Sequence, residues 1–284
     1  MEISDLEWKS IQYRKQLLEV IKRAGAGHMG GDLSCIDILN VLYNTVMNIS
    51  PDRADDPDRD RYVQSKGHAV EALYVVLADR GFFPRSELES LGRYGSRFIG
   101  HPTRDVPGIE HNTGALGHGL AVAIGMALAA KKDGRNYRVF TLLGDGELAE
   151  GSVWEASLAA AHYGLDNLVV IVDRNTLQIT GRTEDVMALE PLRDKFGAFG
   201  YAVRVVDGND ITALEETLGG APFVAGRPSL VLARTVKGRG VSFMQDAAGW
   251  HHHVPDDSEY TAAMQEMELA EQRWRERHGN TVHG

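Results

Sequence analysis

The sequence predicts an α/β fold, a doubly wound parallel sheet with helices on both faces. Two observations carry this prediction. From about residue 137 onward, apolar runs of strand length alternate with helical segments, a spacing typical of βαβ units. One of these runs, residues 168–172 (LVVIV), is apolar throughout, as expected of a strand that helices cover on both faces.

The N-terminal half is predicted to be mainly helical. Apolar side chains in residues 5–23 recur near one stripe, which indicates an amphipathic helix. A glycine-rich loop (AGAGHMGG) follows, and a second helix is expected from about 33 to 46. Residues 48–61 are charged and contain two prolines, which predicts a surface loop. Further along we expect a helix over 70–79, irregular chain over 81–113 and a small-residue helix over 116–131.

The C-terminal half carries the expected sheet. Strands are predicted at 137–143, 168–172, 202–206 and 229–233. Helices are predicted at 148–163, 190–198, 211–218 and 256–278. Because the chain shows no internal repeat and no linker, its 284 residues are expected to form a single domain, with a C-terminal helical extension from about residue 256.

Composition disfavours several classes of function. The formal net charge of -10 argues against a nucleic-acid-binding protein, which needs a basic face to release counterions. Cys35 is the one cysteine, so no disulfide can form within the chain. The sequence has no signal peptide and no apolar run near ~20 residues, which predicts a cytoplasmic protein that does not enter a membrane.

Two short segments at predicted strand ends suggest a metal and phosphate site. Gly144-Asp145-Gly146 directly follows one strand, and Asn175 lies just beyond the next. In an open α/β sheet, ligands bind beyond the carboxyl ends of the strands, where small residues let backbone N–H groups approach a phosphate. The oxygens of Asp145 and Asn175 are ligands that magnesium prefers. Taken singly, Asp145 also suits a helix cap and Asn175 a turn, but the strand–helix–strand spacing favours the metal site.

Three histidines, each beside a glycine, are candidates for chemistry. They are His28 in GAGHMGG, His68 in SKGHA and His101 in FIGHPTRD. A lone histidine in such a loop is more often a surface or hydrogen-bonded residue. Together the three are expected to line a polar cleft, where imidazoles donate to phosphate or shuttle protons near neutral pH.

The spacing of GDG, 28 intervening residues and then Asn resembles the signature of thiamine diphosphate enzymes. The surrounding sequence, from GDGELAEGSVWEA to VVIVDRNTLQITG, resembles the transketolase family. The resemblance implies the diphosphate domain of the thiamine diphosphate-binding fold. It implies that the side chains of Asp145 and Asn175 and the carbonyl of Leu177 bind Mg²⁺, for which Ca²⁺ or Mn²⁺ can substitute. Gly146 would then offer its backbone N–H to the diphosphate.

The histidine segments resemble the same family. On that pattern His28 and His101 face the substrate and take part in proton transfer, and His68 contacts the diphosphate. Gly114 and Leu116, in TGALG, would contact the cofactor's rings.

A later segment, KGRGVSFMQDAAGWHHHVP, resembles the place where the family has another diphosphate-contacting histidine. His251 is the best match, although His252 and His253 leave the register open by one. The chain departs from the family at GHMG and GALG, where GHPG and GPLG are common, and at His118, where Gln is common.

Glu150 and Glu155 follow GDG on the next predicted helix. In most proteins they would be solvated helix charges. In transketolases the matching acids lie at the subunit interface, near the groups that activate the cofactor, and the resemblance implies the same role here.

The resemblance covers about residues 10 to 255, which corresponds to the first of three domains of a full-length transketolase. The pyrimidine-binding domain, which supplies the activating glutamate, is absent. The resemblance therefore implies the N-terminal subunit of a split transketolase, active with a C-terminal subunit that carries the pyrimidine-binding domain, in an α2β2 assembly. The expected reaction moves a two-carbon ketol unit between sugar phosphate substrates.

Two alternatives stay open at this point. The α subunit of a 2-oxo acid dehydrogenase also carries GDG and Asn and needs a partner, but the set of three histidines disfavours it. A non-catalytic cofactor-binding subunit is the other alternative, which intact Asp145, Asn175 and histidines disfavour. The sequence does not name the sugar.

Overall fold

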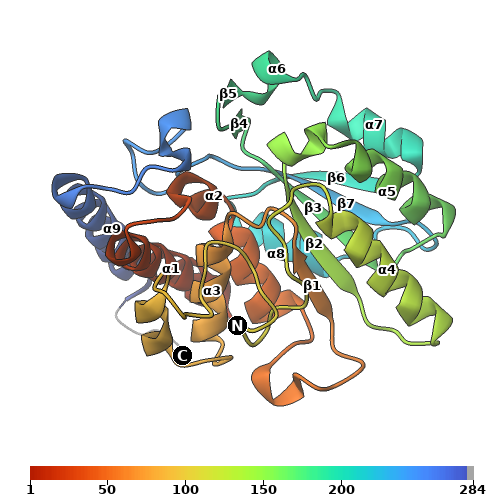
Figure 1. Ribbon diagram of the computed structural model, residues 1–284, viewed down its shortest axis with the longest axis horizontal. Helices are drawn as coiled ribbons and strands as arrows, with labels where there is room; N and C mark the ends of the chain where they lie inside the picture. Colours follow the sequence, from red (N-terminus) through yellow and green to blue (C-terminus); the bar gives the residue numbers. More distant parts are fainter. Residues whose placement is uncertain (280–284) are drawn as a thin grey trace.

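A computed structural model describes residues 1–279 of the chain. Its centre is a five-stranded sheet in which all neighbouring strands are parallel, in the order β1-β2-β3-β7-β6 (Figure 1). The strands are β1 (Arg61–Gln64), β2 (Val139–Gly144), β3 (Leu168–Arg174), β7 (Ser229–Arg234) and β6 (Ala202–Asp207). The predicted doubly wound α/β fold is therefore confirmed.

Helices cover both faces of the sheet. One face carries α1 (Ile3–Ala24), α2 (Met29–Val41), α3 (Val70–Asp79) and α8 (Ile211–Gly219). The other carries α4 (Gly119–Lys132), α5 (Gly151–His162) and α7 (Leu192–Phe199). Successive side chains of a strand point to opposite faces, so Leu142 belongs to the core of the first face and Leu143 to that of the second.

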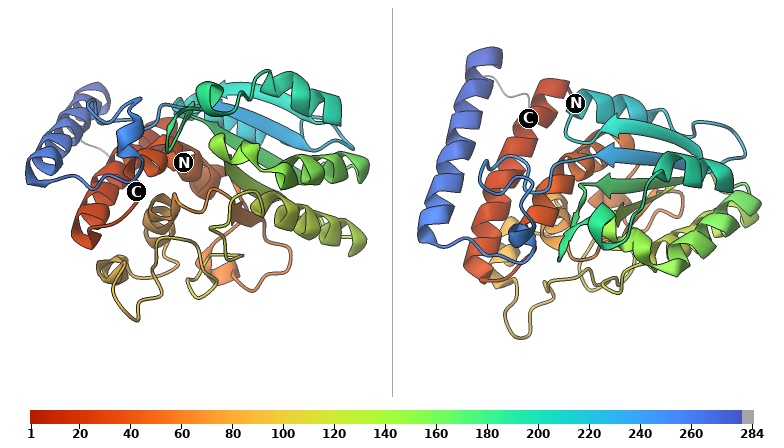
Figure 2. Two further views of the ribbon diagram at one scale, coloured as in Figure 1. Left: turned by 45° about the horizontal axis from the view of Figure 1, so that its top comes forward. Right: turned by 90° about the horizontal axis from the view of Figure 1, so that it is seen from above.

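The remaining elements are short or peripheral. The long C-terminal helix α9 (Asp257–His278) lies alongside α1 (Figure 2). A small hairpin, β4 (Leu177–Gln178) and β5 (Gly181–Arg182), is followed by α6 (Thr183–Val186). Single 3-10 turns lie at Pro51–Arg53, Arg85–Ser90, Gly146–Ala149 and Ala248–His251, and a π-helical segment, Leu42–Val46, continues α2. Within the described residues, no helix is both long and apolar enough to span a membrane.

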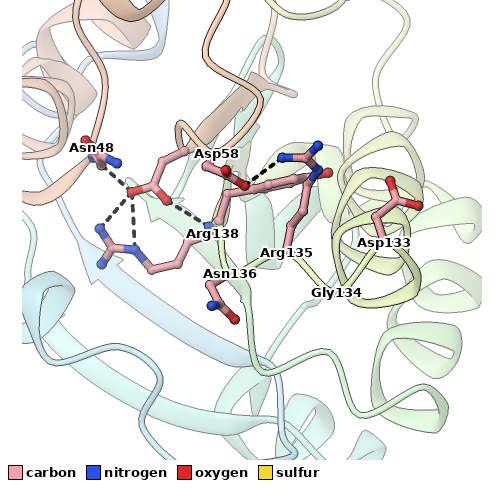
Figure 3. Close-up of a pocket in the computed structure, with 9 residues that line it drawn as sticks. Asn48, Asp58, Asp133, Gly134, Arg135, Asn136 and Arg138 are labelled. Carbon is pink, nitrogen blue, oxygen red and sulfur yellow. Dashed lines mark hydrogen bonds and ion pairs between the residues drawn. The ribbon is translucent and has the colours of Figure 1, made fainter.

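The strand β1 was missed, because its residues adjoin the charged segment that was expected to be loop. Its four residues pair with residues 139–142 of β2. Asp60 fixes the start of both strands, since its carboxylate accepts the backbone N–H groups of Asn48 at 2.9 Å and Arg138 at 2.7 Å (Figure 3). It also accepts the Arg138 guanidinium at 2.8 Å. The charged side chains here therefore serve the amino-terminal edge of the sheet.

Two predicted boundaries near the candidate site were wrong. The second helix begins at Met29 rather than near residue 33, and β3 runs to Arg174 rather than ending at 172. The helix includes a pair of glycines because side chains would not fit. A Cβ atom on Gly30 would lie 2.9 Å from the carbonyl oxygen of Trp250. The small-residue helix starts at Gly119, three residues later than expected.

Candidate functional site

A cavity of about 510 Å³ lies at the carboxyl ends of β2 and β3. This is the edge at which open α/β sheets bind ligands. All of the predicted catalytic, cofactor-binding and metal-binding positions line it. These are His28, His68, His101, Gly114, Leu116, Asp145, Gly146, Asn175, Leu177 and His251.

The floor of the cavity is a row of oxygen atoms at the ends of two neighbouring strands. Gly144 pairs with Asp173 across β2 and β3, so Asp145 and Asn175 follow adjacent strand ends. The Asp145 carboxylate is buried and accepts the Arg174 guanidinium at 2.9 Å and the backbone N–H of Thr176 at 2.6 Å. These bonds fix the carboxylate against the turn that follows β3.

That turn presents consecutive groups to the same side. Thr176 has a φ of 69°, a left-handed conformation that is uncommon for a residue with a branched side chain. Its carbonyl accepts the Thr183 N–H at 2.9 Å, so the hairpin that follows holds the turn in place. The Oδ1 of Asn175 accepts the N–H of Leu177 at 3.1 Å, which orients the amide oxygen.

The charge balance of this row favours a cation. Burial raises the pKa of Asp145, and the nearby charge of Asp173 raises it further, against the opposing effect of Arg174. A bound cation would relieve this cost. A carboxylate, an amide oxygen and the carbonyl of Leu177 make a hard donor set of the kind that Mg²⁺ binds. The residues present therefore fit the predicted ion.

Four imidazoles form one wall. The ring centroid of His28 lies 5.3 Å from that of His68, 6.2 Å from that of His101 and 5.5 Å from that of His251. Burial and the neighbouring imidazoles and lysines lower the pKa of His28 to about 4 and that of His251 to about 3. Burial also lowers the pKa of His68 and His101. At neutral pH these rings are neutral and can accept protons.

Two lysines that were not predicted line the same cavity, Lys66 and Lys237, and both are almost completely buried. Burial opposes the charge of Lys66, but its ion pair with Asp173 raises its pKa. Burial and the charge of Lys66 lower the pKa of Lys237 to about 8. Their place in the sequence, directly before Gly-His and in VKGRG, was the available signal. Two buried ammonium groups make this cavity suitable for an anion.

The loop that carries Gly114 and Leu116 is anchored to the GDG turn by Glu147. This buried carboxylate accepts the backbone N–H of Gly117 at 2.8 Å and that of Gly144 at 3.0 Å, and it also accepts the Ser65 hydroxyl. Gly114 has a φ of 140°, and a Cβ atom there would lie 3.0 Å from the His101 ring. Glu147 was not among the residues predicted from the sequence.

The three consecutive histidines differ in environment. His251 is buried, and its Nδ1 lies 2.9 Å from the Nζ of Lys237. His252 is exposed and lines the cavity mouth, whereas Nε2 of His253 contacts Glu259 at 2.8 Å, away from the cavity. These positions favour His251 as the histidine closest to the lysines.

Three other predicted positions lie outside the cavity lining. Glu150 and Glu155 are exposed, at the N-cap and on the outer face of α5. His118 is exposed, with its Nδ1 3.0 Å from the carbonyl oxygen of Leu116.

An open parallel sheet with oxygen donors, lysines and imidazoles in one cavity at its carboxyl edge defines an α/β protein suited to a phosphate-bearing cofactor and its metal. Residues 9–274 match the family model described as transketolase, thiamine diphosphate binding domain. The chain therefore belongs to the transketolase family and corresponds to its thiamine diphosphate-binding domain.

Similar proteins include whole chains of about the same length. One of the two subunits of an apulose-4-phosphate transketolase from Phocaeicola vulgatus is 49% identical over 94% of this chain and 95% of its own. A 6-deoxy-6-sulfo-D-fructose transketolase subunit from a Clostridium species is 40% identical over 93% of this chain and 96% of its own.

A solved structure with the same fold is considerably longer. The Pichia stipitis transketolase in complex with sedoheptulose 7-phosphate superposes with a TM-score of 0.85 at 27% identity. The match covers 96% of this chain but 46% of that one. The chain thus spans about half the length of this solved transketolase.

Proposed function

We propose that this chain is the diphosphate-binding, N-terminal subunit of a two-chain transketolase. The complex would transfer a two-carbon ketol unit from a ketose phosphate to an aldose acceptor. The observation that carries the proposal is the single cavity in which the oxygen row, the two lysines and the four imidazoles meet. Support for two chains comes from the names of relatives, which are called transketolase subunits and match along nearly their whole length.

The oxygen row is proposed to hold the metal ion and, through it, the cofactor's diphosphate. Asp145, Asn175 and the carbonyl of Leu177 would be the protein ligands of Mg²⁺. The backbone N–H of Gly146 and the side chains of His68 and His251 would contact the diphosphate, together with the ammonium group of Lys237. A cation and a buried ammonium on one anion are mutually supporting, because charge-assisted bonds are stronger than neutral ones.

The upper part of the cavity is proposed to receive the rings and the substrate. Gly114 and Leu116 would contact the cofactor's rings from the loop that Glu147 anchors. His28 and His101 would accept protons from substrate hydroxyl groups and return them, since both rings are neutral at physiological pH. When bound, thiamine diphosphate supplies the electron sink that carries the two-carbon unit.

The outer face of α4 and α5 is proposed as the contact with the partner subunit. On α4, Ala121, Gly125 and Ala129 are exposed, so that another backbone can approach closely. On α5, the side chain of Leu158 is 61% exposed, one turn from Glu155. The partner would be a C-terminal transketolase subunit that carries the pyrimidine-binding domain, in an α2β2 assembly. Glu150 and Glu155 would then lie at the interface.

The test is reconstitution. The chain is purified alone, its candidate partner alone and the two together, and ketol transfer between sugar phosphates is measured with thiamine diphosphate and Mg²⁺. We expect transfer with the pair and none with either chain alone. Full transfer by this chain alone would disprove the two-chain proposal. Decarboxylation of a 2-oxo acid by the pair, followed with an artificial electron acceptor and without ketol transfer, would favour the oxo-acid alternative.

A further inference from the structure

A cluster of three imidazoles stands at the mouth of the cavity, formed by His28, His251 and His252. One ring nitrogen from each of the three lies within 4.8 Å of the other two. The ring centroid of His252 is 4.4 Å from that of His28 and 4.7 Å from that of His251. In the described residues this is the one group of three or more His, Cys, Asp or Glu side chains that comes close enough to hold an ion together.

The cluster is distinct from the oxygen row on the cavity floor. It offers nitrogen atoms, which suit zinc, copper, nickel and cobalt, whereas magnesium prefers oxygen. The buried Nδ1 of His28 has no hydrogen-bond partner among the described residues, so it is free to bind. His252 is exposed and can rotate to complete the group.

Geometry and charge limit the affinity. Zinc–nitrogen bonds of about 2.0–2.1 Å bring tetrahedral ligands to roughly 3.4 Å from one another, so the rings must close by about an ångström. Binding through Nε2 of His251 also places that ring's proton on Nδ1, and the contact with Lys237 must open. The charge of the lysines opposes any bound cation. We therefore expect micromolar rather than nanomolar affinity.

We propose that His28, His251 and His252 form a binding site for a first-row transition metal, with Zn²⁺ as the physiological ion, at the mouth of the cavity. A water molecule would complete the tetrahedron. Zinc there occupies two imidazoles that face the cavity, so it would exclude both substrate and cofactor and act as an inhibitor. The binding step depends on the side chains of this chain alone, and it stands or falls separately from the proposed transferase activity.

The experiment is a titration of the full-length, chelator-treated chain with Zn²⁺ by calorimetry and with Co²⁺ by visible absorption. We expect one ion per chain and the intense ligand-field bands of tetrahedral Co²⁺. The His252→Ala variant should weaken binding at least tenfold, because even the outer-shell partners of metal ligands are worth about 10–100-fold.

Two control variants separate this site from others. His253→Ala removes the adjacent exposed imidazole, which contacts Glu259 instead, and should leave binding unchanged. Asp145→Asn alters the oxygen row and should also retain the Co²⁺ bands. The proposal is overturned if the chain binds no Zn²⁺ or Co²⁺ at micromolar concentrations, if His252→Ala binds as the wild type does, or if the Asp145→Asn variant alone loses the ion.

Discussion

The ammonium group of Lys237 lies 2.9 Å from Nδ1 of His251, and both side chains are buried at the wall of one cavity. Lys237 follows β7 and His251 ends a 3-10 turn, so the fold joins two segments that are 14 residues apart. The pair places a donor-rich surface opposite the oxygen row. It supplies positive charge where the cofactor's diphosphate is proposed to lie.

Replacing Lys237 by Gln should weaken binding of Mg²⁺–thiamine diphosphate by about tenfold or more. A hydrogen bond to a charged group is worth about 1.5–3 kcal/mol, and 1.4 kcal/mol is tenfold in affinity. Calorimetry or quenching of intrinsic fluorescence would measure the dissociation constant. Lys131→Gln, on the exposed surface of α4, is the matched control and should bind normally. Equal affinities for wild type and Lys237→Gln would remove this lysine from the site.

Replacing Asp145 by Asn should abolish the Mg²⁺ dependence of cofactor binding. The substitution keeps the size of the side chain but removes the charge that attracts the ion. Titration with Mg²⁺ at fixed thiamine diphosphate should show a midpoint shifted at least about tenfold, by the same arithmetic. Asp133→Asn, an exposed position at the end of α4, serves as control. An unshifted midpoint in Asp145→Asn would contradict the assignment of the metal ligands.

Replacing Glu147 by Gln should lower the free energy of unfolding by about 1–3 kcal/mol. The carboxylate accepts three donors, and an amide NH₂ group in its place sets donor against donor in a buried position. Urea denaturation monitored by circular dichroism would measure the change. Glu155→Gln changes an exposed side chain on α5 and should have little effect. Unchanged stability would mean that the loop does not depend on this anchor.

A pair of buried carboxyl groups, Asp32 on α2 and Glu71 on α3, predicts a pH dependence of stability. Burial raises the pKa of Asp32 to about 7, and burial together with Asp32 raises that of Glu71 well above its usual value. A group whose pKa is raised in the folded state binds more protons than in the unfolded chain. Its stabilising contribution is present below the unfolded pKa near 4 and is lost as pH rises toward 7.

The unfolding free energy should therefore decline between about pH 5 and pH 7, by up to ~1.4 kcal/mol per pH unit for each such group. Glu71→Gln should flatten this decline, since the amide cannot titrate. Urea denaturation at several pH values would show it, with the exposed Glu89→Gln as control. Parallel pH profiles for wild type and Glu71→Gln would contradict the prediction.

Replacing Leu158 by Asp should impair assembly with the partner without destabilising the chain alone. The side chain is already 61% exposed, so the folded chain loses little, whereas a carboxylate buried at an interface is costly. Analytical ultracentrifugation of the mixed chains would measure association. Leu269→Asp on α9, where the side chain is 51% exposed, is the matched control. Normal assembly of Leu158→Asp would exclude this face as the contact.

Much of the fold could be predicted from periodicity alone. The helix expected over 70–79 is α3, with the same bounds, and the apolar run LVVIV is the centre of β3. The strand β1 escaped because four residues are too few to show an alternation, and charged residues precede them. The hairpin after Asn175 escaped because pairs of two residues carry no pattern. Both depend on partners that are distant in sequence.

The site was predicted in part for a similar reason. The GDG-to-Asn spacing and the Gly-His segments identify residues that lie in turns at strand or helix ends. Lys66, Lys237 and Glu147 carry no such mark, since isolated lysines and glutamates are mostly solvated. Their burial is a property of the assembled sheet and of the helices that close over it. Only the folded chain shows that they face the cavity.

The anchoring of two separate segments by Glu147 implies selection for molecular length. On the proposed orientation, the GDG turn grips one end of the cofactor and the Gly114 loop supports the other, and one carboxylate sets the separation of the two grips. Thiamine monophosphate, which lacks the terminal phosphate, could satisfy one grip but not both. The chain would therefore act as a gauge that distinguishes the diphosphate from its shorter precursor before any chemistry begins.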